Sequence, residues 1–252
     1  PAPDAAHCIL NPKNVQVMEI VQDRDQDRDL NNDRDSARKS GGIPATTPSN
    51  LPAALPPDLK ALLSNPLMID FEATPDGGVF HIGAVLNGLV FDEDNISNPV
   101  PALKRLSRFA QGATYVLGHN IIKHDLALAR NHCPDAGILS LIPIDTLMLS
   151  PLAFPENPYH RLIKGYKLLS ASRNNPVADA TLSMVLFEDE LAAFLLLKET
   201  TPGLIDFFAW AFDLPAGTFL GISRLFENLG DEKPDERRAR DLFLNLCRDR
   251  GC

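Results

Sequence analysis

The sequence predicts an α/β fold in which helices pack on the faces of a mixed β-sheet. Three observations lead to this prediction. The run Leu67–Ala73 is apolar apart from two carboxylates, the dipeptide Asn87-Gly88 separates the next two apolar runs, and helical and strand-like patterns alternate after residue 100. The resulting order, β-β-β-α-β-α-β, is typical of an α/β sheet flanked by helices.

The first three strands are expected to form an antiparallel meander. Apolar residues of Leu67–Ala73 fall on both faces of the strand, which indicates a central strand covered on both sides. The runs Val79–Leu86 and Leu89–Glu93 follow. Between them lies Asn87-Gly88, the dipeptide that best tolerates the two positive φ angles of a tight hairpin turn.

Parallel strands and helices are expected to follow the meander. The long last helix has Asn175 as its expected N-cap and Pro176 at its first position, where the missing N–H has no intrahelical partner to lose. In chain order, the expected elements are a helix over Pro101–Gln111, a strand at Thr114–Gly118, a helix from about Ile121 to Asn131, a strand at Leu141–Asp145 and a helix from Pro176 to about Lys198.

The chain divides into three parts. Residues 1–50 hold a tract of alternating Asp and Arg that cannot bury enough surface to offset its chain entropy, so we predict a disordered low-complexity arm. Residues 51–200 form the α/β domain. Residues 201–252 are expected to form a helical C-terminal extension, with helices near residues 202–212, 219–229 and 235–248.

The composition excludes several classes of protein. With 44% hydrophobic and 23% charged residues, the 252-residue chain is globular rather than collagen-like or wholly disordered. Its apolar runs fall well short of the ~20 residues needed to cross a bilayer, so no membrane partner is expected. Four scattered cysteines without a CxxC pair support neither a disulfide framework nor a zinc knuckle, and a reducing cytoplasm is the expected setting.

A net charge of −9 argues against indiscriminate binding to polyanions. One stretch, between Glu156 and Asp179, nevertheless contains basic residues and no acidic one. It combines phosphate-pairing charges with aromatic faces, as single-strand binders do, although a solvated surface loop is the alternative. The residues concerned are Tyr159, Arg161, Lys164, Tyr166, Lys167 and Arg173.

Four carboxylates are candidate metal ligands. Asp70 and Glu72 are two residues apart on a strand, so they point to the same face, and two neighbouring like charges in a buried strand need a cation. Asp179 lies in line with core leucines of the last helix, where an unpartnered carboxylate is costly. Asp125 lies beside the apolar face of its helix, and its alternative is a solvent-facing residue in a first turn.

The blocks MIDFEAT, GHNIIKHD and NNPVADA resemble the three motifs of the DEDD (DnaQ-like) 3′-to-5′ exonucleases, which have an RNase H-like fold. The segment IDTLMLSPLAFPENPYHRLIKGYKLL is similar to the exonuclease module that precedes the helicase in some bacterial RecQ-like ATP-dependent DNA helicases. The resemblance covers roughly residues 60 to 200 and makes 51–200 an exonuclease domain. It implies that two Mg²⁺ or Mn²⁺ ions are held by Asp70, Glu72, Asp125 and Asp179.

The reaction implied by this resemblance is hydrolysis of the terminal phosphodiester at the 3′ end of a single strand, with DNA favoured over RNA. Many family members carry a general-base His five residues before the last Asp, or a Tyr four before it, whereas Asn174 and Asn175 stand there in this chain. His160 is the nearest titratable replacement, since an ordinary imidazole pKa of ~6.5 suits proton transfer at neutral pH. Its alternative is packing beside Tyr159. The predicted substrate-contacting residues are His119, Asn120, Tyr159, Arg161, Lys164 and Lys167.

Several further interpretations stay open or are disfavoured. The chain has no GxxxxGK[ST] loop, so a helicase would lie beyond Cys252 or on another protein. A DEDD-like fold without the usual base could act as a weakly catalytic module that binds nucleic acid or a partner, and RNA could replace DNA as substrate. Zinc binding by His119, His124, His132 and Cys133 is disfavoured by their spacing, and Asp145 is expected to be a helix N-cap or a support for the ligands.

Overall fold

The computed structural model describes residues 57–157, 160, 175–213 and 219–249. The arm predicted over residues 1–50 lies outside the described residues. Five strands form one sheet in the order β3-β2-β1-β4-β5. Their bounds are β1 Leu67–Ala73, β2 Val79–Leu86, β3 Leu89–Glu93, β4 Tyr115–Gly118 and β5 Ile142–Asp145.

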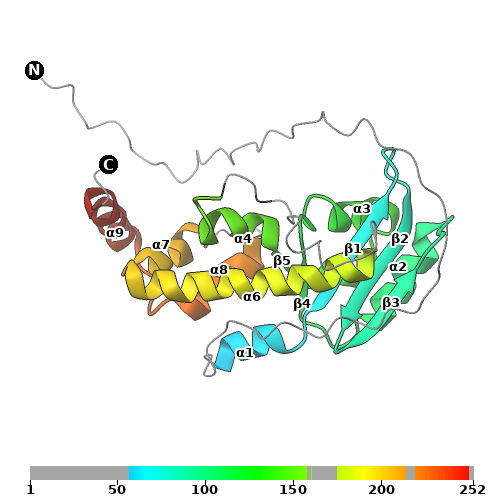
Figure 1. Ribbon diagram of the computed structural model, residues 1–252, viewed down its shortest axis with the longest axis horizontal. Helices are drawn as coiled ribbons and strands as arrows, with labels where there is room; N and C mark the ends of the chain where they lie inside the picture. Colours follow the sequence, from blue (N-terminus) through cyan, green and yellow to red (C-terminus); the bar gives the residue numbers. More distant parts are fainter. Residues whose placement is uncertain (1–56, 158–159, 161–174, 214–218, 250–252) are drawn as a thin grey trace, which may run out of the picture. The chain divides into compact units, whose positions relative to one another are not determined.

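The sheet is mixed, and it confirms the predicted fold class. Strands β1, β2 and β3 pair antiparallel, while β4 pairs parallel with both β1 and β5. Asn87 and Gly88, at φ 52° and 74°, form the β2–β3 turn as predicted. An antiparallel meander joined to parallel strands, with helices on both faces, is the RNase H-like arrangement (Figure 1).

The helices agree with the sequence pattern for α2, α6 and the segments after residue 200, whereas α1 and η2 were not expected and the regions near residues 121 and 146 differ. Residues 121–124 form a turn, closed by a hydrogen bond from the His124 N–H to the Asn120 carbonyl, so α3 begins later than expected. Helix α4 was expected only through the candidate N-cap Asp145 and was given no bounds, and Pro151 lies inside it. The helices are α1 Pro57–Ser64, α2 Pro99–Phe109, α3 Asp125–His132, 3₁₀ helix η2 Gly137–Ser140, α4 Thr146–Ala153, α6 Pro176–Thr200, α7 Leu204–Ala211, α8 Leu220–Leu229 and α9 Glu236–Asp249.

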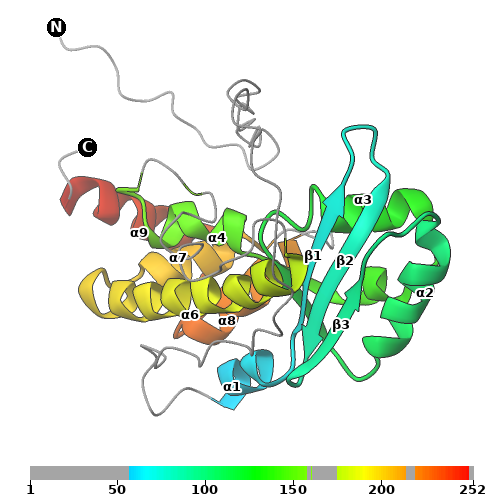
Figure 2. The ribbon, with the colours of Figure 1, turned by 45° about the vertical axis from the view of Figure 1, so that its right-hand side comes forward.

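Two buried clusters cover the two faces of the sheet. Helices α2 and α3 pack over Ile69 and Phe71 of β1, whereas α6 packs over the opposite face with α4 and α8 (Figures 1 and 2). Successive side chains of a strand alternate between faces. Since Ile69 and Phe71 point toward α2, Asp70 and Glu72 point toward α6.

Helices α7 and α8 belong to the core on the α6 face. Ile205 of α7 and Phe226 of α8 are buried in the same cluster as Ile144 of β5. Gly221 lets α8 approach the sheet, because a Cβ there would overlap the carbonyl oxygen of Pro143. The three predicted C-terminal segments are helical, and two of them, α7 and α8, complete the second core. Among the described helices, none combines the length and apolar character of a membrane span.

Candidate metal centre

Asp70, Glu72 and Asp179 meet at one point of the α6 face. One carboxylate oxygen from each lies within 4.8 Å of the others, and all three side chains are partly exposed. Strand β1 supplies two of the carboxylates through its period of two residues, and the first turn of α6 supplies the third. The structure thus brings together three of the four predicted ligands from positions more than a hundred residues apart in sequence.

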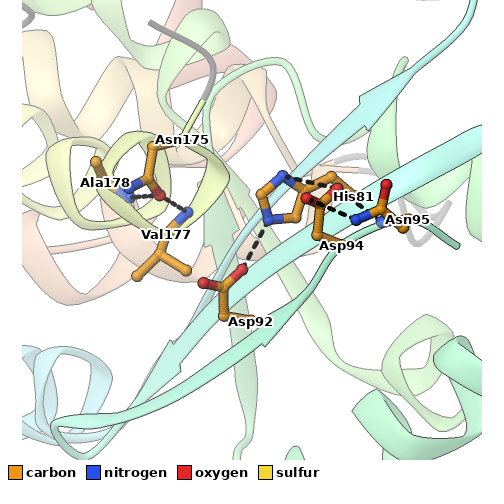
Figure 3. A network of polar contacts seen from close by, with 7 residues as sticks. All are labelled: His81, Asp92, Asp94, Asn95, Asn175, Val177 and Ala178. Carbon is orange, nitrogen blue, oxygen red and sulfur yellow. Dashed lines mark hydrogen bonds and ion pairs between the residues drawn. The ribbon is translucent and has the colours of Figure 1, made fainter. Parts of the chain in front are cut away.

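Gly83 allows α6 to reach the sheet at this point. It lies opposite Asp70 in the β1–β2 register, and a Cβ at residue 83 would overlap backbone atoms of Pro176 and Val177. The Asn175 Oδ1 caps the helix here by accepting hydrogen bonds from the N–H groups of Val177 (3.1 Å) and Ala178 (3.2 Å) (Figure 3). The predicted cap is confirmed. The close approach places the first turn of α6, with Asp179, over β1.

Asp125, the fourth predicted ligand, lies beside the cluster but outside the 4.8 Å group. Its side chain is 1% exposed, and its Oδ1 accepts a hydrogen bond of 2.6 Å from the N–H of Phe71, the residue between Asp70 and Glu72. Burial raises the pKa of the Asp125 carboxyl, and a hydrogen bond to His124 opposes this effect. The alternative of a solvent-facing first-turn Asp is therefore wrong.

His124 is a site residue that the sequence interpretation missed. Its Nδ1 lies 3.5 Å from the Asp125 Oδ2, and its side chain is about half exposed. The hydrogen bond to Asp125 raises the pKa of His124 against the effect of burial, and the charges of Asp125 and Glu72 act in the same direction. The sequence signal for this role was the position of His124 directly before Asp125. The spacing of the histidines, considered for zinc binding, does not indicate it.

His81 extends the polar surface from β1 to β3. It lies opposite Glu72 in the β1–β2 register, on the α6 face, and its Nε2 is 2.7 Å from the Asp92 Oδ1 (Figure 3). Its Nδ1 lies 3.8 Å from an oxygen of Asp94. Asp92 in turn lies opposite Gly83. The row of polar groups beside the three carboxylates was not predicted, because it depends on the register of three strands.

The turn after β4 carries two residues predicted to contact substrate. Asn120 adopts the left-handed conformation, with φ 64°, and its N–H donates to the Asp145 Oδ1 at 2.8 Å. The His119 Nδ1 lies 2.9 Å from the Thr146 Oγ1, while that hydroxyl donates to the Gly118 carbonyl at 3.3 Å. Since the hydroxyl proton is used, His119 donates from Nδ1.

Asp145 caps α4, as predicted. Its Oδ1 accepts a hydrogen bond of 3.0 Å from the N–H of Leu147, the second residue of the helix. The carboxyl is buried, and this burial raises its pKa to about 6 against the effect of three backbone hydrogen bonds. Asp145 is not among the three carboxylates that converge at the candidate metal centre.

The structure describes the predicted general base, His160, but not residues 158–159 and 161–174 on either side of it. Its ring is partly buried, its Nδ1 has no hydrogen-bond partner within the described residues, and burial lowers its pKa. The predicted basic loop, with Tyr159, Arg161, Lys164 and Lys167, lies outside the described residues.

Neither a protein-family model nor a curated protein matches the sequence. The kind of ligand that the site can hold therefore follows from its own oxygen donors. Carboxylate oxygens are the ligands that hard divalent cations such as Mg²⁺ and Mn²⁺ prefer. Three such groups within 4.8 Å, on an RNase H-like sheet, can hold a divalent cation at a partly open surface where a further ligand can enter.

Proposed function

We propose that the protein is a divalent-metal-dependent 3′-to-5′ exonuclease that hydrolyses the terminal phosphodiester of a single strand. The observation that carries the proposal is the convergence of Asp70, Glu72 and Asp179 from β1 and α6 on the α6 face of the sheet. The resemblance of the three sequence blocks to DEDD exonucleases supports the same activity. In this function Asp125 completes a set of four carboxylates for two Mg²⁺ or Mn²⁺ ions.

The donor set fits hard cations. Carboxylates that lie this close repel one another when ionised, so a bound cation stabilises their charged forms. Bound divalent ions would make an attacking water more acidic and neutralise charge on the phosphate. Phe71 contributes by donating its backbone N–H to Asp125, which keeps that carboxyl against β1 between Asp70 and Glu72.

Proton acceptance falls to a histidine in this proposal. Burial lowers the pKa of His160, so a larger fraction of this imidazole is neutral near pH 7 and able to accept a proton. His124 is the competing group, because it lies beside Asp125 and feels the charge of Glu72. Asn175 takes no part as a base, since its side-chain oxygen caps α6.

The proposed substrate is single-stranded nucleic acid, with DNA favoured. The basic loop between Glu156 and Asp179 supplies the expected phosphate contacts, and His119 and Asn120 are expected to face the terminal nucleotide. By the resemblance, a helicase in the same polypeptide or in a complex is the expected partner. We place the activity in the cytoplasm, in line with the free thiols of Cys133 and Cys247.

A second function, a weakly catalytic module that binds nucleic acid or a partner, is favoured by one observation. The position four residues before Asp179 is used to cap α6 and cannot supply a base. Such a module would retain the metal centre and strand binding but turn over slowly. The two functions differ in rate, so they are separated by one assay.

The assay is incubation of the protein with single-stranded DNA or RNA that carries a free or a blocked 3′ end. Mg²⁺, Mn²⁺ or EDTA is added, and products are resolved by length. The proposal expects stepwise shortening of the free 3′ ends with metal and none with EDTA. Asp70→Asn should remove this activity, whereas Asp241→Asn, at an exposed position of α9, should not. Activity that Asp70→Asn leaves at the wild-type level would overturn the two-metal proposal.

A further inference from the structure

Asp145 binds two separate segments of backbone from the end of β5. Its side chain is 1% exposed. Oδ1 accepts hydrogen bonds from the N–H groups of Asn120 (2.8 Å) and Leu147 (3.0 Å), and Oδ2 accepts one from Ile122 (3.0 Å). Only the bond to Leu147 belongs to the helix cap. The other two reach across 25 and 23 residues to the turn after β4.

This turn needs external support. Asn120 occupies the left-handed region, which a non-glycine residue adopts only at a cost. Strand β4 ends at Gly118 and α3 begins only at Asp125, so the N–H groups of Asn120 and Ile122 have no earlier helical turn to bond to. Thr146, next to Asp145, adds a contact to His119 and another to Gly118.

The turn leads directly into the predicted ligand Asp125. The Leu126 N–H bonds to the Ile121 carbonyl, so the start of α3 is tied to the turn that Asp145 holds. At its other end the turn meets β1, because a Cβ at Gly118 would lie 2.6 Å from the carbonyl oxygen of Ile69. The turn therefore fixes how the first residue of α3 approaches the strand that carries Asp70 and Glu72.

We infer that Asp145 is a positioning residue of the metal centre: it holds the β4–α3 turn so that Asp125 lies against Phe71 and His119 stays at the edge of the sheet. This inference rests on the proposed nuclease function for its activity readout. It extends the role of Asp145 beyond helix capping, because two of its three hydrogen bonds contribute nothing to α4. Asp145 needs no contact with metal or substrate for this role.

Asp145→Ser separates the two roles. A serine can still cap α4 through the Leu147 N–H, but its shorter side chain cannot reach Asn120 and Ile122 as well. Because a misplacement of about 1 Å can cost on the order of 10²-fold in rate, we expect the turnover number to fall by ~10- to 100-fold. The affinity for Mn²⁺, measured by calorimetry, should fall too. Asn98→Ala, which removes the cap of α2 on the opposite face of the sheet, should leave both unchanged.

A rescue tests the mechanism directly. Asn120→Gly in the Asp145→Ser background should restore part of the turnover, since glycine adopts the left-handed conformation without strain. The Asn120→Gly single variant measures any direct loss at that residue. If Asp145→Ser misfolds, Asp145→Asn serves as the second variant. It retains the shape of the side chain but puts an amide nitrogen in place of the oxygen that accepts from the Ile122 N–H. Wild-type turnover and Mn²⁺ affinity in folded Asp145→Ser and Asp145→Asn would overturn the inference.

The outcomes also separate this inference from the proposed function. If the wild-type protein shows no nuclease activity, the function fails, but Mn²⁺ affinity still reports whether Asp145 positions the site. If the wild type is active and Asp145→Ser matches it, only the inference fails. An equal loss in Asp145→Ser and Asn98→Ala would assign the effect to general destabilisation rather than to the β4–α3 turn and would also overturn the inference.

Discussion

The backbone of Pro176 lies against Gly83, so closely that a Cβ at residue 83 would overlap it. This contact joins the start of α6 to the residue of β2 that lies opposite Asp70 in the β1–β2 register. The position of Asp179 relative to Asp70 and Glu72 therefore depends on a glycine that carries no chemistry of its own. A substitution there should act on the proposed metal centre by changing the distance of Asp179 from Asp70 and Glu72.

Gly83→Ala should displace the first turn of α6. We expect destabilisation by about 1–3 kcal/mol, as for other overpacked positions, together with weaker Mn²⁺ binding and a lower nuclease rate. Urea unfolding measures the first effect and calorimetry the second. Gly137→Ala is the control, since its new Cβ would come no closer than 3.3 Å to a side chain on the other face. Unchanged Mn²⁺ affinity in Gly83→Ala would disconnect the α6 contact from the metal centre.

Asp179→Asn should abolish nuclease activity without unfolding the protein. In EDTA its melting temperature should equal or exceed that of the wild type, because one of three mutually repelling carboxylates is gone. Saturating metal stabilises a folded state that binds it, by about 2.7 kcal/mol at a hundredfold excess over Kd. The wild type should show such a rise with Mn²⁺, and Asp179→Asn should show little of it. An equal rise in both proteins would place the cation elsewhere.

The sequence predicts best what is encoded locally. Asn87-Gly88 and Asn175-Pro176 hold their turn and cap signals within a few residues, and both agree with the structure. The burial of Asp125 could not be predicted in this way, because it depends on a hydrogen bond from the N–H of Phe71, 54 residues earlier. His81 likewise enters the site through strand register, which a single sequence does not specify in advance.

Stability in EDTA should depend on pH through two buried carboxyls. Burial raises the pKa of Asp145 to about 6 and that of Glu190 well above its ordinary value. The charge of Asp125 adds to the effect on Asp145, and the charges of Asp145 and Asp189 add to the effect on Glu190. A raised folded-state pKa gives stability that is present below the unfolded pKa and lost as pH rises through the folded value. The contribution of Asp145 should therefore be lost as pH rises through about 6.

Glu190→Gln isolates the second group. The amide stays neutral at every pH and can keep the hydrogen bond from the Ser150 hydroxyl, which is 2.9 Å long in the wild type. The melting temperature of this variant should fall less between pH 5 and pH 8 than that of the wild type. Glu199→Gln, at an exposed position of the same helix, should follow the wild type. Parallel pH profiles for Glu190→Gln and the wild type would mean that Glu190 does not ionise over this range.

His160→Ala tests the proposed proton acceptor. If His160 accepts the proton of the attacking water, the rate should fall by ~10²- to 10⁴-fold and its pH dependence near neutrality should flatten. His124→Gln is the comparison, because His124 is the described histidine with a contact to Asp125. A normal rate and pH profile in His160→Ala, with a large loss in His124→Gln, would transfer the role to His124.

Lys164→Ala combined with Lys167→Ala tests the basic loop. The double variant loses two proposed phosphate contacts but none of the carboxylates, so Mn²⁺ affinity should stay while single-strand binding weakens. By counterion release, the slope of log K against log salt should become shallower by up to ~0.7 for each lost contact. The control is Lys104→Ala with Arg108→Ala, which removes the same charge from exposed positions on α2, across the sheet from the metal centre. In an exonuclease, turnover at limiting substrate should fall in step with binding for the first pair and remain for the second. The two double variants remove the same charge, so they should differ only if specific contacts to the strand lie in the loop. If both weaken binding equally, the strand is bound through the overall charge of the protein rather than through the loop.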